Sequence, residues 1–301
     1  MLPSLKMLFK TAKDKLRDFF FFFLEVLKRA KEHRIDDLAA IIAYYTLWAS
    51  VPLSGAMLYL STYILGSSEK IINDLNLFSQ EFLAKINPRF FFNMKVYARS
   101  IKEIGLLGIY LAVFLGTLLV SKIIQSIQII YGCKYSQSFF WRKLKEFAIL
   151  ITAGFILILS FALIAGITTL NTIIEANQQI ATYINPSFIN SINNFLIKNA
   201  FPFLLSFLFF FGLYKWIPER KVSSRAAFKS ALLSSFLWQI STSILVWYVS
   251  HISKAGKVYG TLSTVIIFIF WVEISSLVML FGAEIASLLN ERRELEAKTN
   301  S

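Results

Sequence analysis

Two acidic residues interrupt the last apolar stretch of the chain, which covers residues 262–289. At about 1.5 Å of rise per residue, a helix of this length crosses a hydrocarbon layer about 30 Å thick. Glu273 and Glu284 lie almost three helical turns apart, so they share one face of that helix with Ser276 and Leu280. An ionised carboxylate at the bilayer centre costs about 2.5–3.5 kcal/mol even on the more lenient insertion scale. We therefore expect Glu273 to face protein, water or a cation, or to be protonated.

A basic residue, Lys122, lies inside another apolar stretch, residues 104–130. It borders a polar stripe at helical spacing, formed by Ser121, Gln125, Gln128 and Gly132. Two interpretations are open: the long side chain of Lys122 reaches the cytoplasmic interface, or its ammonium pairs with Glu273 or Glu284. Glu284 lies nearer the membrane surface, and the alternative to ion coupling there is that it anchors the end of the helix.

Two further residues are expected near the middle of the bilayer, at the depth of Glu273. Pro52 lies inside the first apolar stretch, where its missing N–H predicts a kink. Gln239 lies near the centre of the fifth stretch. Broken helices are typical of transport sites, although a kinked helix is also an ordinary packing feature. The candidate translocation or coupling residues are therefore Pro52, Lys122, Gln125, Gln239, Glu273 and Glu284.

The numbers and spacing of cysteine and histidine argue against a metal site built from thiols or imidazoles. The chain has one cysteine, Cys133, and two histidines, His33 and His251, which match no metal-ligand spacing. Glu273 and Glu284, about 16 Å apart along one helix, cannot share a catalytic metal. No Gly-x-Ser-x-Gly motif with a matching histidine is present. The sequence predicts neither a metal site nor a cofactor, and we do not expect an enzyme.

The elements that must hold these residues are membrane-spanning helices. Hydrophobic residues make up 56% of the 301 residues, and the mean hydropathy of +0.60 is well above that of a soluble domain. The formal net charge of +13 comes mainly from residues between the apolar stretches, without a folded basic module that reads bases. We therefore expect no nucleic-acid partner, and interpret the basic residues as loop charge that orients the helices and meets anionic lipid head groups.

The pattern predicts an all-α polytopic membrane protein with six transmembrane helices and amphipathic interfacial helices. The membrane domain covers residues 38–290, with spans at about 38–65, 104–130, 147–170, 200–216, 227–249 and 262–289. Residues 1–37 are expected to form an amphipathic helix in the cytoplasmic interface, or one that packs under the bundle. Residues 67–102 are interpreted as an outer insertion of short amphipathic helices, and residues 291–301 as a cytoplasmic tail.

Basic residues gather in four segments: the N-terminal segment, the loops after spans two and four, and the C-terminal tail. By the positive-inside rule this predicts both termini in the cytoplasm, although the outer insertion also carries Lys and Arg. The candidate residues for binding anionic head groups lie in the two cytoplasmic loops and are Arg142, Lys143, Arg220 and Lys221.

Short motifs along the chain resemble those of one family of bacterial inner-membrane proteins. They are, in order, Tyr44-Tyr45-Thr46-Leu47 with Val51-Pro52-Leu53, Leu213-Tyr214-Lys215-Trp216-Ile217-Pro218 with Arg220-Lys221-Val222, Tyr259-Gly260-Thr261-Leu262-Ser263, and Gly282-Ala283-Glu284-Ile285. In this order and spacing, over residues 36–290, the chain resembles the YihY/BrkB family, whose members were formerly mislabelled ribonuclease BN. The resemblance implies six spans, both ends in the cytoplasm and a place in the inner membrane. Glu284 belongs to the shared motifs, whereas Glu273 does not.

The polar residues and the resemblance together favour a transporter or flippase of a lipid or other amphipathic solute. One relative in the family is linked to export of lipid A precursors. A polar groove between helices would shelter a head group from hydrocarbon, and the expected partners are membrane lipids, above all anionic ones. The alternative is a structural or assembly protein that recruits an envelope protein through residues 69–100, and a homo-oligomer is also open.

Overall fold

The computed structural model describes residues 3–65, 88–133, 140–152, 154–155, 200–251 and 262–299. Within these residues the elements are helices: α1 (Pro3–Glu32), α2 (Ile35–Leu65), α4 (Pro88–Ile130), residues 140–152, α8 (Phe201–Trp216), α9 (Ser224–His251) and α11 (Leu262–Thr299). The all-α class predicted from the sequence is confirmed for this part of the chain.

Three described helices are long and apolar enough to cross a membrane, namely Leu107–Ile130 in α4, Ser224–His251 (α9) and Val265–Thr299 in α11, while α8 is apolar but shorter. These four helices coincide with predicted spans, and α2 contains the predicted span 38–65. The remaining predicted span, 147–170, lies mostly outside the described residues. The count of six spans and the cytoplasmic position of the termini stay predictions.

Helix α9 turns large apolar side chains outward and mostly small ones inward. On α9 the buried residues are Ala226, Ala227, Ser230, Ala231, Ser234, Ser235 and Leu245. The exposed residues of the same helix include Phe228, Leu232, Phe236, Ile240, Ile244 and Trp247. In water this arrangement would leave a broad apolar surface uncovered, whereas in a bilayer the lipid tails cover it. The distribution of side chains is that of a membrane-embedded bundle.

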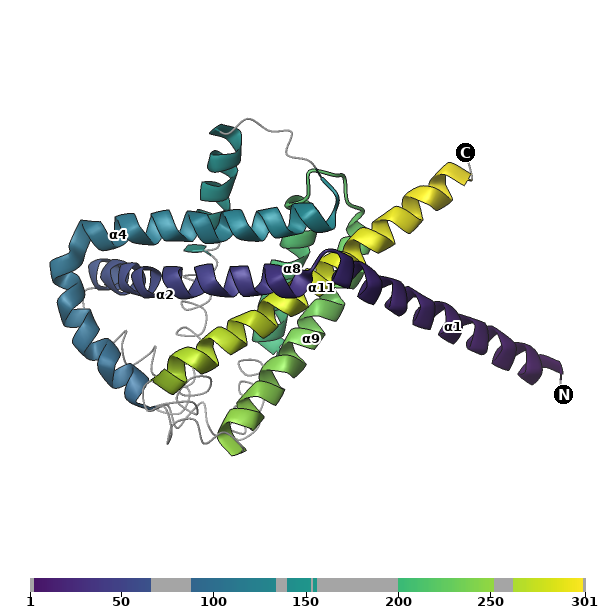
Figure 1. Cartoon of the computed structure of the whole chain (residues 1–301), viewed down its shortest axis with the longest axis horizontal. Coiled ribbons are helices and arrows are strands. Elements are labelled where there is room, and N and C mark those ends of the chain that lie inside the picture. The colour runs from purple at the N-terminus through teal and green to yellow at the C-terminus, as the bar shows by residue number, and fades with distance from the viewer. Residues whose placement is uncertain are drawn as a thin grey trace, which may run out of the picture.

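Helix α11 is the centre of the bundle. It contacts α1, α2, α4, α8 and α9, and in Figure 1 α2 lies between α4 and α11. The buried core contains side chains from five helices, among them Ile42 of α2, Ile127 of α4, Leu213 of α8, Ala231 of α9 and Leu280 of α11. The stretch that carries the two acidic residues is therefore also the stretch around which the other helices pack.

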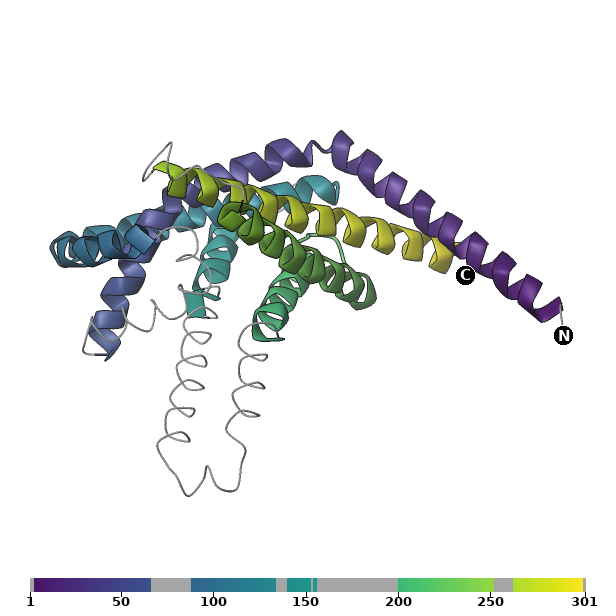
Figure 2. The same ribbon diagram turned by 90° about the horizontal axis from the view of Figure 1, so that it is seen from below.

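Helix α1 extends away from the bundle, and its last turns contact α11 (Figures 1 and 2). Val26 packs there against Ile285 and Leu288. Phe20 and Phe21, further from the contact, are exposed. Both views place the N- and C-termini at the same end of the molecule. The end of α1 thus packs on the bundle, whereas Phe20 and Phe21 stay exposed.

Two predicted boundaries do not appear as breaks in the helices. α4 runs from Pro88 to Ile130 without interruption, whereas the sequence predicts an outer insertion that ends at residue 102. Proline is tolerated at the first turn of a helix, and no other proline follows within α4, so the polar and apolar parts form one helix. α11 likewise continues to Thr299 through the predicted tail, because Glu, Arg, Leu and Lys are good helix formers. Residues 66–87 lie outside the described part.

Two residues with positive φ set the turns beside the site. α4 ends in a Schellman motif, in which Gly132 (φ 61°) donates its N–H to the carbonyl of Ile129 and Cys133 donates to that of Gln128, both at 3.0 Å. Arg34, between α1 and α2, has a φ of 51°, which is uncommon for a residue with a side chain. This second turn brings His33 to the side of α11.

Helix α2 changes direction part-way along its length (Figure 2). Pro52 lies in the interior of this helix, where its missing N–H removes one backbone hydrogen bond and permits such a bend.

Candidate functional site

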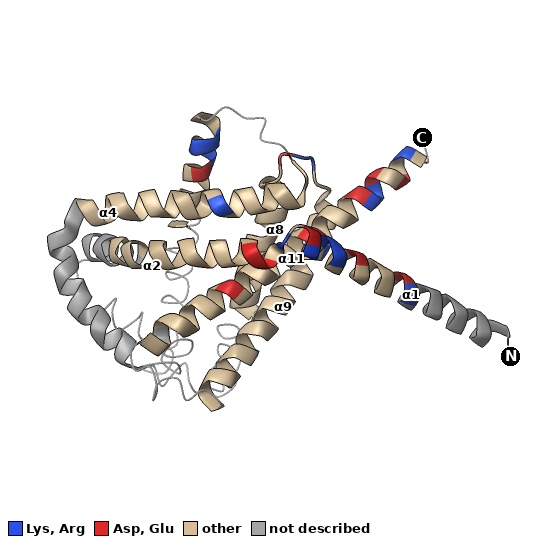
Figure 3. Ribbon diagram, in the orientation of Figure 1, with Lys and Arg blue, Asp and Glu red and all other residues tan. Residues whose placement is uncertain are grey.

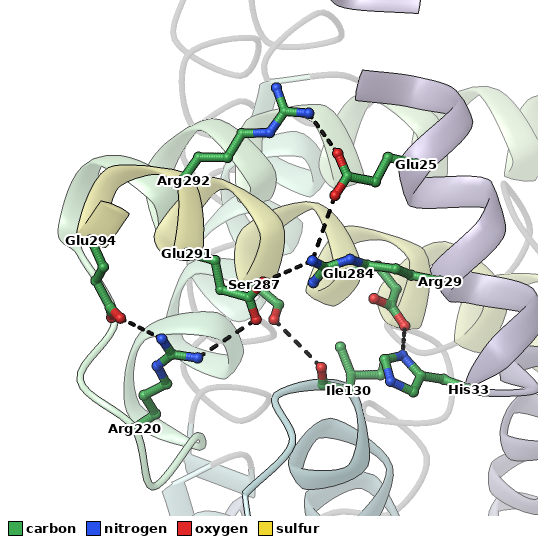
Figure 4. Close-up of polar contacts among 10 residues, drawn as sticks. All are labelled: Glu25, Arg29, His33, Ile130, Arg220, Glu284, Ser287, Glu291, Arg292 and Glu294. Carbon is green, nitrogen blue, oxygen red and sulfur yellow. Dashed lines mark hydrogen bonds and ion pairs between the residues drawn. The ribbon is translucent and has the colours of Figure 1, made fainter. Parts of the chain in front are cut away.

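Charged residues gather where the end of α1, α11 and the connection between α8 and α9 meet (Figure 3). We call this cluster the charged junction. Its members are Glu25, Arg29, His33, Arg220, Glu284, Glu291, Arg292 and Glu294. Figure 4 shows these side chains pointing toward one another from their separate elements.

Glu284 is the most deeply buried acidic residue of the junction, with 0% of its side chain exposed. Its Oε1 lies 2.5 Å from Nδ1 of His33, whose side chain is 29% exposed. Its other oxygen, Oε2, is buried and has no hydrogen-bond partner within the described residues. Because burial penalises an ionised carboxylate, such a group needs a cationic partner, hydrogen bonds or a proton.

The other six members form an alternating chain of arginines and glutamates. Arg292 lies 2.6 Å from Glu25, and Glu25 lies 3.6 Å from Arg29. Arg29 continues to Glu291 at 2.8 Å, Glu291 lies 3.6 Å from Arg220, and Arg220 closes on Glu294. The chain joins α1, α11 and the α8–α9 connection.

These contacts favour the charged forms of the arginines. The hydrogen bond that Arg29 donates to Glu291 raises the pKa of Arg29, and the hydrogen bond that Arg220 donates to Glu294 raises the pKa of Arg220. Both guanidiniums therefore stay charged and committed to carboxylates.

A hydrogen-bonded group next to Gly282 brings α8, α9 and α11 together. Tyr214 is fully buried, and its hydroxyl donates to the carbonyl of Met279 at 2.8 Å and lies 2.9 Å from Oγ of Ser234. A Cβ atom at position 282 would collide with the Tyr214 hydroxyl and with Ser234 Oγ. The glycine of the Gly-Ala-Glu motif thus makes room for the contact two residues before Glu284.

Side-chain amides hold the irregular connection between α8 and α9. Asn290 accepts from the N–H of Ser223 at 2.8 Å and donates to the carbonyl of Lys221 at 3.2 Å. Gln128 donates to the carbonyl of Ile217 at 3.2 Å. These bonds supply partners for backbone groups that no helix satisfies, and they fix the loop that carries Arg220.

Lys145 adds a further contact to this connection. Its ammonium donates to the carbonyl of Ile217 at 3.1 Å. Burial lowers the pKa of Lys145, and the nearby Glu219 opposes that shift.

Tyr131, which directly follows α4, is a buried donor near Glu284. Its hydroxyl has no hydrogen-bond partner within the described residues. Burial raises the pKa of Tyr131, and the nearby Tyr214, Cys133 and Glu284 raise it further. The hydroxyl therefore keeps its proton and can donate a hydrogen bond.

Three of the four predicted head-group residues pair with carboxylates. Lys143 lies 2.6 Å and Arg142 lies 3.8 Å from the carboxylate of Glu146, which is buried. Arg220 belongs to the alternating chain. Since a paired cation attracts an anionic head group less strongly, these contacts favour a structural role for the three. Lys221 is exposed.

Lys122 contacts neither predicted carboxylate in the described part of the chain. Its ammonium donates to Gln125 Oε1 at 3.3 Å and lies 5.4 Å from the ring centre of Tyr45. The predicted ion pair with Glu273 or Glu284 is therefore not found among the described residues.

Glu273 and Gln239 are only half-buried. Near these two residues, α9 and α11 are joined by a hydrogen bond that Trp238 Nε1 donates to Ser275 Oγ, at 3.1 Å. The structure therefore gives Glu284, rather than Glu273, the closed polar environment that the sequence analysis assigned chiefly to Glu273.

Sequence reasoning missed His33, Arg29 and Glu25 as partners of α11. A signal was present, because the three recur every four residues and so share one face at the end of α1. Glu284 and Glu291, seven residues apart, likewise share a face of α11. The spacing indicates two charged faces, but it does not show that they meet.

No group of three or more His, Cys, Asp or Glu side chains within the described residues is placed to hold a metal ion. The arrangement offers proton exchange and ion pairing instead.

The sequence model of the family described as Virulence factor BrkB matches residues 26–301, which include Glu284 and its partner His33. The chain belongs to the BrkB family. The predicted resemblance is therefore confirmed. No solved structure matches this BrkB-family chain.

Curated relatives of this BrkB-family chain are named as membrane proteins. A UPF0761 membrane protein of Psychromonas ingrahamii is 26% identical over 287 residues, which cover 94% of this chain and 92% of the relative. One of Aliivibrio salmonicida is 26% identical, covering 93% and 86%, and one of Haemophilus influenzae is 25% identical, covering 88% and 93%. Together with the apolar outer surface of the helices, these relatives identify the chain as an integral membrane protein.

Proposed function

We propose that this chain moves a lipid or another amphipathic solute across the bacterial inner membrane, with six spans and both termini in the cytoplasm. The observation that carries the proposal is the fully buried carboxylate of Glu284 on α11, a helix long enough to cross the membrane. Ionisable groups in such helices are costly, and they commonly mark pathways of substrates, ions or protons.

Buried polar side chains between the membrane-length helices support a polar path. They lie on α4, α9 and α11 and are Ser121, Ser126, Gln128, Ser230, Ser234, Ser235, Ser276 and Ser287. Hydroxyls and amides lower the desolvation cost of a lipid head group, while its acyl chains stay in the surrounding bilayer. In this proposal Gln125, Lys122, Gln239 and Glu273 extend the path, and the interruption of backbone hydrogen bonding at Pro52 in α2 accommodates movement.

The expected lipid contacts lie at the cytoplasmic surface. Exposed Lys221 attracts anionic head groups, and Phe20 and Phe21 of α1 insert among acyl chains. This assigns α1 to the interface in its exposed turns and to the bundle at its end.

Proteoliposomes that hold the purified full chain test the proposal. We expect labelled phospholipids, and anionic ones most rapidly, to move between leaflets faster than in protein-free vesicles. Glu284→Gln should slow this movement, and Glu273→Gln, Lys122→Ala and Lys221→Ala should show which neighbours contribute. Protein that is folded but moves none of several lipids and lipid A-type precursors would contradict the proposal. That result would favour a structural or assembly protein that recruits a partner through residues 69–100.

A further inference from the structure

The alternating chain of the charged junction is electrically balanced without Glu284. It contains three guanidiniums, from Arg29, Arg220 and Arg292, and three carboxylates, from Glu25, Glu291 and Glu294. Each arginine in it contacts at least one of these carboxylates. The cations of the chain are therefore already committed, and they leave no positive charge over for a fourth carboxylate.

The remaining pair, His33 and Glu284, is balanced only by an additional proton. A neutral imidazole beside an ionised carboxylate carries one negative charge, and one more proton on either group makes the pair neutral. Their 2.5 Å contact joins an oxygen with no exposure to a ring that solvent still reaches. Uncompensated charge at such a depth is costly, so the closed contact favours the protonated pair.

The other groups that face Glu284 from the surrounding elements supply this charge only in part, because the nearby Arg29 favours the ionised carboxylate and Glu291 opposes it. Arg29 on α1 is bound to Glu291, which lies two turns further along α11. Tyr131, which directly follows α4, is a neutral hydrogen-bond donor. Its buried hydroxyl and Oε2 of Glu284 both lack a hydrogen-bond partner within the described residues. A neutral carboxyl group fits these surroundings better than a second negative charge beside Glu291.

We propose that His33 and Glu284 form a proton-binding site whose occupancy holds the α1–α2 turn against α11. The inference rests on the proposed function, since it names the proton as the coupling ion. The proton enters from solvent at the exposed edge of His33 and returns to solvent when the contact opens. Because closing the contact takes up a proton, a rise in pH favours the open form.

Distance measurements on the full-length protein in lipid nanodiscs test this site. In a Cys133→Ser background, spin labels at Leu27 and Leu295, which are 45% and 63% exposed, report the separation of α1 and α11. We expect one short separation at mildly acidic pH and a growing population of longer separations at mildly alkaline pH.

Two variants should change this response in opposite directions. Glu284→Gln, which is neutral at every pH, should stay closed and lose the pH response. His33→Gln, at the solvent-accessible turn, should shift the population toward the open form at neutral pH. If Glu284→Gln does not fold, this variant alone tests the proton site. Glu296→Gln, at an exposed position of the same helix, is the matched control and should respond like the unmodified protein.

An unmodified protein without pH response, or a Glu284→Gln variant with the full response, would overturn the proton site. These measurements do not depend on transport. A pH response without lipid movement would support the proton site and contradict the flippase, and lipid movement without a pH response would do the reverse.

Discussion

A missing side chain at position 282 sets the distance between three helices. The Tyr214 hydroxyl and Ser234 Oγ occupy the space that a Cβ atom would need. Both oxygens are buried and hydrogen-bonded to each other, so neither can move without loss of a bond. Gly282 therefore serves close packing between helices, as small residues commonly do in membrane bundles.

Gly282→Ala should destabilise the bundle by about 1–3 kcal/mol, the usual cost of overpacking a core. Gly154→Ala is the control, because a Cβ atom there has no close contact, within 4 Å, with other described parts of the chain. Thermal unfolding in detergent, followed by size-exclusion chromatography, should give a lower midpoint for Gly282→Ala than for Gly154→Ala. Equal midpoints would show that the Tyr214 and Ser234 oxygens do not restrict this position.

Docking of α1 on α11 combines a small apolar contact with ion pairs. Val26 lies against Ile285 and Leu288, and Arg29 pairs with Glu291 beside them. An apolar contact of this size does not hold a long helix firmly, because each buried aliphatic side chain contributes only about 1.5–3 kcal/mol. The ion pairs should therefore decide how often α1 leaves the bundle.

Exchange of charges between the two helices tests this role. Arg29→Glu alone and Glu291→Arg alone should each increase cleavage by proteinase K at the α1–α2 turn several-fold, and the double exchange should restore most of the protection. Lys28→Glu is the control, because Lys28 and Glu32 form a pair whose side chains are 78% and 57% exposed, and such pairs contribute little. A double exchange as sensitive as either single change would mean that the two charges do not interact.

The helices could be predicted from the sequence, but the contacts between them could not. Apolar runs of membrane length and the carboxylate in the Gly-Ala-Glu motif are local features. The sequence indicates that Glu273 lies deeper in the membrane than Glu284, because depth is inferred from position along the predicted span. In the structure, Glu284 contacts His33, which lies 251 positions earlier, and no local pattern reveals such a pairing. The continuity of α4 was missed because its polar first part resembles a separate amphipathic segment.

At the scale of the whole molecule, apolar and charged groups occupy different regions. Apolar side chains cover the outside of the membrane-length helices, and charges concentrate at the junction of α1, α11 and the α8–α9 connection (Figure 3). Both termini lie at the same end of the molecule (Figure 1). Glu284 lies where these regions meet, buried on α11 and in contact with the partly exposed His33. This position suits a group that links proton uptake to movement of helices.

Measuring lipid movement with and without a pH difference across the bilayer tests whether Glu284 couples proton uptake to the proposed transport. Proteoliposomes with a pH difference across the bilayer should move labelled anionic phospholipid faster than the same vesicles without one. Glu284→Gln should abolish this acceleration, and the control Glu296→Gln, at an exposed position of the same helix, should retain it. A rate that is the same with and without the pH difference, or an acceleration that survives Glu284→Gln, would contradict a role for Glu284 in proton-coupled transport.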